Sequence, residues 1–167
     1  MTNEARLSEL AGEALKLAKD RRLSFVTAES CTAGKLAVLL SEAPGASEHL
    51  HGGIVAYTKP SKVAALGLSA DMLHAKGAVC CEVAAAMAAG ALAHSPADYA
   101  VAITGVAGPE PDEDGNPVGL VCLAVSARNG KTVTSEKRYG DLGRAAIQRN
   151  AMADALLLLI AAAQKDA

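Results

Sequence analysis

Apolar and polar residues alternate with a helical period over most of the chain. Between residues 4 and 20, apolar side chains recur every three or four positions, the spacing that places them on one face of a helix. The same spacing predicts further helices over residues 31–40, 60–66, 71–75, 81–93 and 144–163. Pro60 suits the first turn of its helix, where the backbone N–H that proline lacks is not needed.

Short runs of consecutive apolar residues separate these helices and predict buried strands. They cover residues 23–28, 53–57, 99–104, 118–127 and 132–139. The run over 99–104 shows no alternation, so we expect both of its faces to be covered. The last two runs are joined by Asn129-Gly130, a dipeptide that favours a tight hairpin turn.

The order of these elements predicts the fold class. Helices and strands alternate through the first hundred residues, which is typical of parallel βαβ units, and the hairpin then adds antiparallel pairing. We therefore expect an α/β fold, a three-layer α/β/α domain with a mixed β-sheet. The sequence shows no internal repeat or dividing linker, so a single domain over residues 1–167 is expected.

Composition narrows the function classes. The chain is 51% hydrophobic but only 2% aromatic, so its core must be built from small aliphatic side chains. The net charge of -2 and the lack of a basic patch argue against nucleic-acid binding. No uninterrupted apolar run reaches the roughly 20 residues of a membrane helix, and the first residues do not resemble a signal peptide. These features predict a cytoplasmic protein without a membrane partner.

The sulfur and imidazole side chains give no metal-site signature. Their spacing fits neither a zinc site nor a disulfide framework, so we expect no metal and reduced thiols. The residues concerned are Cys31, Cys80, Cys81, Cys122, His49, His51, His74 and His94.

The first candidate for chemistry is Ser30, at the junction between a predicted strand and a predicted helix. Free backbone N–H groups at such a junction can stabilise the oxyanion that forms when a serine attacks a carbonyl. The alternative is that Ser30 is an ordinary helix N-cap, a role for which serine is preferred.

The second candidate is the segment from Tyr57 to Lys62, also at a strand-to-helix junction. Serine is a weak nucleophile without a base, and a lysine can be that base if burial lowers its pKa. Lys59 and Lys62 are both possible on this reasoning, and either is equally compatible with a solvated position at a helix start.

The third candidate is the segment Ile103-Thr104-Gly105-Val106-Ala107-Gly108-Pro109 at the end of a buried strand. Crevices beyond the carboxyl ends of strands are where open α/β sheets bind ligands, and glycine allows close approach to the backbone. A plain turn that opens the following loop is the alternative.

Together these segments resemble the CinA C-terminal-domain family. Residues 27–34 read TAESCTAG and are similar to the TAESCTGG signature of that family. Residues 53–57 (GIVAY) followed by Lys62, residues 77–79 (GAV) and residues 103–109 (ITGVAGP) are similar to its later motifs. Residues 117–119 (PVG) and Gly140-Asp141 followed by Arg144 match the rest, in the right order along nearly the whole chain.

The resemblance implies a nicotinamide-nucleotide amidase. Such an enzyme converts nicotinamide mononucleotide and water to nicotinic acid mononucleotide and ammonia in pyridine nucleotide salvage, without a metal or other cofactor. Carried over, the nucleophile is Ser30 and its helpers are Lys62 and Tyr57, and Lys59 has no consistent counterpart in the family. The expected substrate contacts are Cys31, Thr32, Ala33, Gly34, Thr104, Gly105, Gly108 and Arg144.

Three departures from the family pattern affect these expectations. Ala33 replaces the first glycine of a Gly-Gly pair, which matters only if that position needs a positive φ. Cys80 stands where the family usually has serine. Leu142 and Gly143 are inserted before Arg144, which leaves the position of that side chain open.

Two other functions remain compatible with the sequence. One is a Ser-Lys amidase for another small carboxamide, and the other is a non-catalytic CinA-like interaction module. The expected partner is a small nucleotide, and a homo-oligomer, in the simplest case a dimer, is expected for a domain of this kind.

Overall fold

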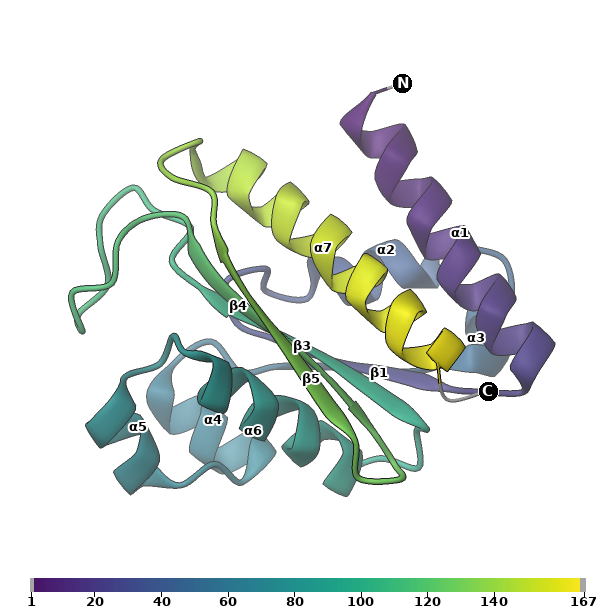
Figure 1. Cartoon of the computed structure of the whole chain (residues 1–167), viewed down its shortest axis with the longest axis horizontal. Coiled ribbons are helices and arrows are strands. Elements are labelled where there is room, and N and C mark those ends of the chain that lie inside the picture. Colours follow the sequence, from purple (N-terminus) through teal and green to yellow (C-terminus); the bar gives the residue numbers. More distant parts are fainter. Residues whose placement is uncertain (1, 166–167) are drawn as a thin grey trace.

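The computed structural model describes residues 2–165 and arranges them as a central sheet between two layers of helices (Figure 1). The strands are β1 (Phe25–Glu29), β2 (Leu50–Val55), β3 (Tyr99–Gly105), β4 (Leu120–Ala127) and β5 (Thr132–Arg138). The helices are α1 (Asn3–Arg21), α2 (Lys35–Ser41), α3 (Ala46–His49), α4 (Lys59–Leu66), α5 (Ala70–Lys76), α6 (Cys81–Ala93) and α7 (Arg144–Lys165).

The sheet is mixed, as the sequence predicted. Its strand order is β2-β1-β3-β4-β5; β1 pairs in parallel with β2 and β3, and β4 is antiparallel to both β3 and β5. The parallel strands follow from the helical crossovers, and the antiparallel ones follow from the loop and the hairpin after β3. The α/β fold with a mixed sheet is thus confirmed.

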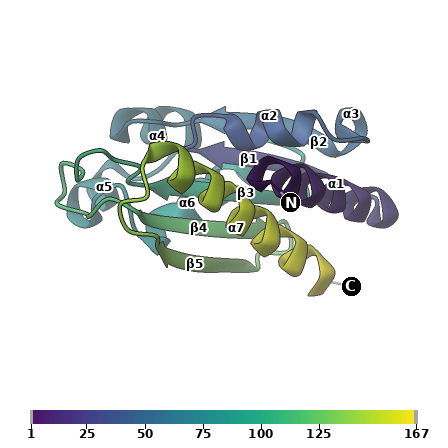
Figure 2. The same ribbon diagram turned by 90° about the horizontal axis from the view of Figure 1, so that it is seen from above.

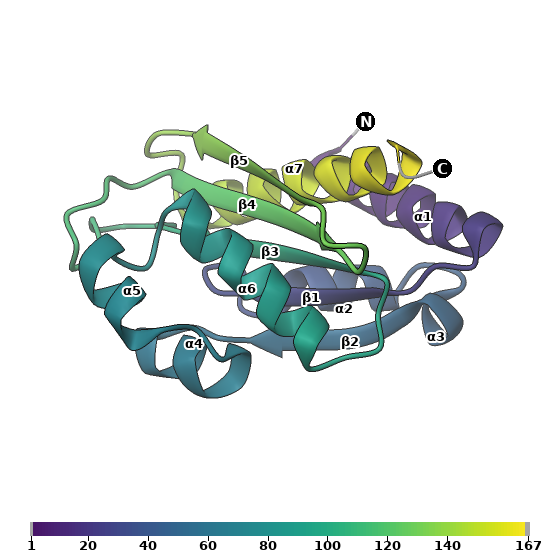
Figure 3. The same ribbon diagram turned by 60° about the horizontal axis from the view of Figure 1, so that its bottom comes forward.

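Helices cover both faces of the sheet, as the views from above and below show (Figures 2 and 3). Helices α1, α2, α3 and α7 lie on one face, and α4, α5 and α6 lie on the other. Because side chains alternate along a strand, Phe25 and Ile103 enter the first layer, whereas Val26, Ala100 and Ala102 enter the second. The alanines on the second face allow α6 to pack close to the sheet.

Helices α4 and α6 pack so closely that one position requires glycine. A Cβ placed on Gly90 of α6 would lie 2.1 Å from the carbonyl oxygen of Leu66, the last residue of α4. This approach fixes the position of α4 on α6.

Three details of the elements differ from the predictions. The predicted helix over 31–40 is wrong at its start, because residues 31–34 form turns and α2 begins at Lys35. Helix α3 is an additional element that the sequence pattern did not predict. Strand β2 begins at Leu50, three residues before the predicted start, and ends before Tyr57.

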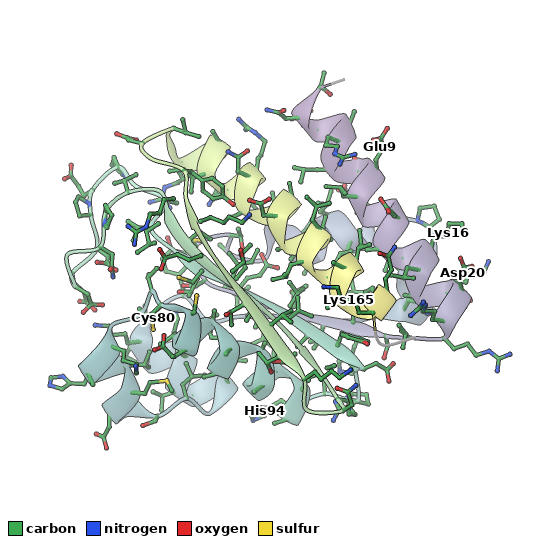
Figure 4. All side chains as sticks on the ribbon, in the orientation of Figure 1. Glu9, Lys16, Asp20, Cys80, His94 and Lys165 are labelled. Atoms are coloured by element: carbon green, nitrogen blue, oxygen red, sulfur yellow. The ribbon has the colours of Figure 1, made fainter. Side chains whose placement is uncertain are left out.

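Helix α7 is long and apolar enough to cross a membrane by length and composition alone, although polar residues interrupt its apolar sequence. In the structure its buried residues pack against α1 and the sheet, which is how the core helix of a globular domain is placed. Charged side chains lie on the outside of the helical layers, such as Lys16 and Asp20 on α1, whose charged atoms lie 2.6 Å apart (Figure 4).

Candidate functional site

Ser30 and Lys62 meet at the carboxyl end of β1. Ser30 follows the strand directly, and its backbone N–H donates to the carbonyl of Ile103 on β3. Lys62 lies in the first turns of α4, and its Nζ is 2.8 Å from Ser30 Oγ. Two residues that are 32 positions apart in sequence are therefore in hydrogen-bond contact.

The surroundings of Lys62 favour its neutral form. The side chain is 1% exposed, and Nζ also donates to the carbonyl of Ala56 at 3.0 Å. No carboxylate forms an ion pair with it among residues 2–165. Burial lowers the pKa of Lys62 from 10.5 to about 8, because desolvation penalises the ammonium form. A lysine with that pKa can accept the proton of a serine near neutral pH.

The turn that carries Ser30 is held by the buried carboxylate of Glu29. Its oxygens accept the hydroxyl protons of Thr27 and Thr32 at 3.1 and 2.7 Å. They also accept the backbone N–H groups of Gly34, Leu36 and Ala37, which lie at the start of α2. Glu29 therefore caps α2 from outside the helix, and the turn over 31–34 places Ser30 away from the helix itself. The expectation that Ser30 directly precedes a helix as its N-cap is wrong, because Gly34 holds the N-cap position of α2.

The backbone donors that follow Ser30 are bonded within the turn or buried. Ala33 N–H and Lys35 N–H bond within the turn, and later donors bond to Glu29. The N–H of Cys31 lies against its own thiol, and Thr32 is fully buried.

Ser30 and Lys62 line a cavity of about 680 Å³, a volume in the range of small-molecule sites. Its other walls come from the ends of β2 and β3, the starts of α4 and α6, and the loop after β3. Among them is Thr104, which is 1% exposed and donates its hydroxyl to the Ala78 carbonyl at 2.7 Å. The remaining lining residues are Tyr57, Thr58, Lys59, Pro60, Ala78, Val79, Gly105, Asp112, Glu113 and Asp114.

An acidic loop forms one wall of this cavity. Lys59 Nζ lies 2.7 Å from Asp114 and 2.9 Å from Glu113, and Asp114 also accepts the N–H of Ala78. The side chain of Lys59 is thus paired with carboxylates rather than solvated, and this pairing raises its pKa. Lys59 is therefore protonated and unsuited to act as a base, unlike Lys62.

Tyr57 and Arg144 lie at the edge of the site. Tyr57 is 53% exposed, and its carbonyl accepts the Ser30 hydroxyl at 3.3 Å. Arg144, at the start of α7, donates to the Gly108 carbonyl and lies 3.5 Å from the Tyr57 hydroxyl. Arg144 thus reaches the loop beside the site despite the Leu142-Gly143 insertion, in which Gly143 takes a positive φ of 81°.

The four residues after Ser30 do not line the cavity. Cys31 is buried in the core under α7, where burial raises the pKa of its thiol to about 12. Thr32 is fully buried against Glu29. Ala33 is exposed at a positive φ of 51°, and Gly34 has a φ of 92°. No side chain of residues 31–34 lines the cavity, so any contact of this segment with a substrate must come from the backbone.

The substitutions Ala33 and Cys80 have local consequences. Ala33 occupies the left-handed region, which costs an L-residue about 1 kcal/mol or more, so the condition under which this substitution matters is met. Cys80 stands at the N-cap position of α6 (Figure 4). Its side chain makes no cap hydrogen bond. A serine hydroxyl there would be a better acceptor for the free N–H groups of the helix.

Sequence reasoning missed three residues of the site. Glu29 and Gln148 form hydrogen bonds with the turn after β1, and Asp114 binds Lys59 and so holds the acidic loop in place. Glu29 lies inside the recognised motif and was detectable there. The partners of Asp114 and Gln148 are 55 and more than 100 positions away in sequence, so no local pattern indicates them.

No metal site is formed by the described residues. Among residues 2–165, no group of three or more His, Cys, Asp and Glu side chains could hold a metal ion. The cavity brings together a serine and a buried lysine with a lowered pKa.

Comparison with known proteins assigns the family. The sequence model of the CinA C-terminal domain matches residues 7–163. The chain belongs to the CinA C-terminal domain family. The matched region contains every element that borders the cavity.

Relatives of this family share both sequence and structure with the chain. A CinA-like protein of Mycolicibacterium vanbaalenii is 50% identical over 115 residues, which are 69% of this chain and 27% of the relative. One of Thermosynechococcus vestitus is 39% identical over 90% of this chain and 36% of the relative. The chain therefore spans about a third or less of the length of these relatives.

Solved structures of similar length agree with the fold. The competence/damage inducible protein from Agrobacterium tumefaciens superposes with a TM-score of 0.90 at 43% identity, covering 93% of this chain and 94% of the other. A CinA superfamily protein from Klebsiella pneumoniae gives 0.91 at 31% identity, covering 95% and 98%.

Proposed function

We propose that this CinA-family chain is a nicotinamide-nucleotide amidase. It hydrolyses the carboxamide of nicotinamide mononucleotide, giving nicotinic acid mononucleotide and ammonia for pyridine nucleotide salvage. The observation that carries the proposal is the contact between Ser30 Oγ and the buried Lys62 Nζ at 2.8 Å. A binding module has no need for a desolvated lysine against a serine, whereas a serine nucleophile needs such a base beside it.

The first half of the reaction forms an acyl-enzyme. Ser30 Oγ attacks the carboxamide carbon, and neutral Lys62 accepts the hydroxyl proton. Protonated Lys62 then donates to the amide nitrogen, directly or through Tyr57, the C–N bond breaks, and ammonia leaves.

The second half repeats the proton transfers with water. Water attacks the ester carbon while Lys62 accepts one of its protons, and the bond to Ser30 Oγ breaks as the proton returns to that oxygen. Nicotinic acid mononucleotide leaves and the site is restored. No metal ion or other cofactor takes part in these steps.

The charges around the cavity suit the two ends of this substrate. The pyridinium ring is cationic and faces the wall of Asp112, Glu113 and Asp114. The phosphate is anionic and lies toward Arg144, with the backbone of Gly105 and Gly108 and the wall at Thr104 close by. We propose Thr104, Gly105, Gly108 and Arg144 as substrate contacts on this basis.

The direct test is release of ammonia from nicotinamide mononucleotide by the purified chain, with EDTA present. Wild type should be active, and Ser30→Ala should lose at least about a thousandfold in kcat because the covalent route is gone. Ser41→Ala, at an exposed serine on α2, is the control and should retain full activity.

Each other outcome identifies a different function. Activity of Ser30→Ala near the wild-type level contradicts the nucleophile. If ammonia is released from another carboxamide but not from the nucleotide, the Ser-Lys mechanism stands and the proposed substrate is wrong. No amidase activity at all favours the interaction module. A cytoplasmic location and a soluble nucleotide as partner stay expectations.

A further inference from the structure

The loop between β3 and β4 is bonded to itself in its middle, over residues 110–116. The carboxylate of Asp112 accepts the backbone N–H groups of Asp114 and Asn116 at 3.1 and 2.7 Å, and the side-chain amide of Asn116 at 2.9 Å. Aspartate stabilises turns in this way by bonding to nearby backbone donors. These bonds stiffen the segment internally, but they do not attach it to the rest of the protein.

Two acidic side chains make that attachment. Among the described residues, every hydrogen bond and ion pair from residues 110–116 to the rest of the protein comes from Glu113 or Asp114. Glu113, whose side chain is 74% exposed, reaches only Lys59, at 2.9 Å. Asp114, whose side chain is 25% exposed, lies 2.7 Å from Lys59 Nζ and accepts the Ala78 N–H at 3.1 Å. Asp114 therefore carries most of the attachment.

The position that receives Asp114 is fixed to the sheet. A Cβ on Gly77 would lie 2.7 Å from Asp114 Oδ2, so the absence of a side chain there leaves space for the carboxylate. The carbonyl of the next residue, Ala78, accepts the buried hydroxyl of Thr104 on β3 at 2.7 Å. Ala78 thus receives the loop through its N–H and the sheet through its carbonyl, and Asp114 is docked on a rigid part of the protein.

The ion pair of Lys59 and Asp114 joins two walls of the cavity that contains Ser30 and Lys62. Lys59 is the first residue of α4, the helix that carries Lys62, and Asp114 belongs to the loop after β3. Both residues line the cavity. If this contact breaks, the segment loses its main attachment and one wall of the cavity can move away.

We propose that Lys59 is a positioning residue for substrate binding, which acts as a latch by holding residues 110–116 against the cavity through Asp114. The inference rests on the proposed function of this cavity as a substrate site. The substrate binds in the latched state, and Lys59 takes no part in the proton transfers of Lys62. A partly exposed ion pair contributes little free energy, so the latch can open and close as substrate enters and product leaves.

Loss of the latch should raise KM and leave kcat nearly unchanged. When only a fraction of the molecules is competent to bind, the apparent dissociation constant rises by the inverse of that fraction. In the bound complex the segment is closed again, so Ser30 and Lys62 react as in wild type. We expect Lys59→Met to raise KM about 3–10-fold and to change kcat by less than about twofold.

The matched control is Lys16→Met. Lys16 pairs with Asp20 at 2.6 Å on α1, and both residues lie outside the lining of the cavity. Its KM and kcat should stay within about twofold of wild type. Lys59→Arg keeps the positive charge and can bridge both carboxylates, so its KM should also stay close to that of wild type.

Asp114→Ala distinguishes the latch from a direct contact of Lys59 with the substrate. It removes the same attachment from the other side, so KM should rise by a similar factor. The double variant Lys59→Met/Asp114→Ala should then be no worse than about twofold above the higher single variant, because both changes remove one interaction. If Lys59 instead contacted the substrate phosphate, Asp114→Ala would free the lysine and lower KM. If the two residues acted separately, their effects would multiply.

Amide hydrogen exchange tests the latch without any substrate. The N–H groups of residues 110–116 should exchange about threefold faster or more in Lys59→Met and Asp114→Ala, and at the wild-type rate in Lys16→Met, because exchange reports local opening. If exchange changes in this way but wild type releases no ammonia from nicotinamide mononucleotide, the proposed function fails and the latch stands.

Thermal unfolding shows that each variant is folded, and Lys59→Gln replaces Lys59→Met if that variant is not. Unchanged exchange in a folded Lys59→Met overturns the inference. So does a loss of kcat at unchanged KM, which would place Lys59 in the chemistry, or an unchanged KM in an active Asp114→Ala.

Discussion

Lys62 shows how one side chain acquires its chemistry from its surroundings. Lysine is rarely buried, and nothing local to residues 58–62 distinguishes Lys62 from Lys59. Lys62 is buried in contact with Ser30, whereas Lys59 is paired with Asp114 and Glu113. The first environment lowers the pKa and the second raises it.

The pH dependence of the reaction should report the pKa of Lys62. A base must be deprotonated, so kcat/KM should rise with pH on a limb with a midpoint near the lowered pKa of about 8. The measurement is kcat/KM across pH, with the substrate phosphate, which titrates near pH 6, accounted for separately.

The control is Lys62→Arg, because guanidinium does not deprotonate in this range. Its activity should be low and its profile should lack the limb. An active Lys62→Arg with the wild-type profile would show that the proton of Ser30 leaves by another route.

The backbone conformation of Ala33 leads to a prediction about the stability of the protein. It holds a positive φ of 51°, which glycine adopts without the steric cost of a Cβ. Ala33→Gly should therefore raise the free energy of unfolding by about 0.5–1 kcal/mol, the left-handed penalty less the entropy cost of glycine. Denaturant unfolding measures this, and a loss of stability in Ala33→Gly would contradict the strain.

At the scale of elements, the site depends on how α4 sits on α6. Helix α4 carries Lys62, and Gly90 of α6 lies directly under its last turn. Sequence periodicity predicted both helices but not their distance. That distance decides whether Lys62 Nζ reaches Ser30 Oγ.

Gly90→Ala should destabilise the protein and reduce its activity. The added Cβ would lie 2.1 Å from the Leu66 carbonyl, so α4 must move, at a cost of about 1–3 kcal/mol. The matched control is Gly12→Ala in α1, where a Cβ meets nothing within 4 Å and should stabilise by about 0.5–1 kcal/mol.

Thermal unfolding and ammonia release measure both variants. Equal stability changes in Gly90→Ala and Gly12→Ala would mean that the contact between α4 and α6 is not tight.

At the scale of the whole molecule, the sheet brings distant segments to one edge. Parallel β1 and β3 end side by side, and their carboxyl ends deliver Ser30 and Thr104 to the same cavity. The loop after β3 returns over the start of α6 and adds the acidic wall. One cavity is thus built from five separate segments of the chain.

The predicted dimer concerns this scale too. Val55 on the edge strand β2 and Val38 on the neighbouring α2 are 47% and 58% exposed. An exposed apolar edge favours association with a second copy. Sedimentation equilibrium should give twice 16.9 kDa, and Val55→Lys should lower that mass. Leu157→Lys, at an exposed leucine on α7, is the control and should not. A single-chain mass at all concentrations would refute the dimer.

Sequence alone determined the order and type of nearly all elements, the mixed sheet and the family. Those follow from local periodicity, turn residues and a motif set that covers the chain. The family resemblance already preferred Lys62 to Lys59, but the physical basis of that preference came only from the tertiary structure. So did the orientation of the turn at Ala33 and the contacts of Asp114 and Gln148. The physical reason is range: periodicity reports which face of an element is buried, whereas a pKa or a long-range hydrogen bond depends on atoms brought together by the sheet from distant parts of the chain.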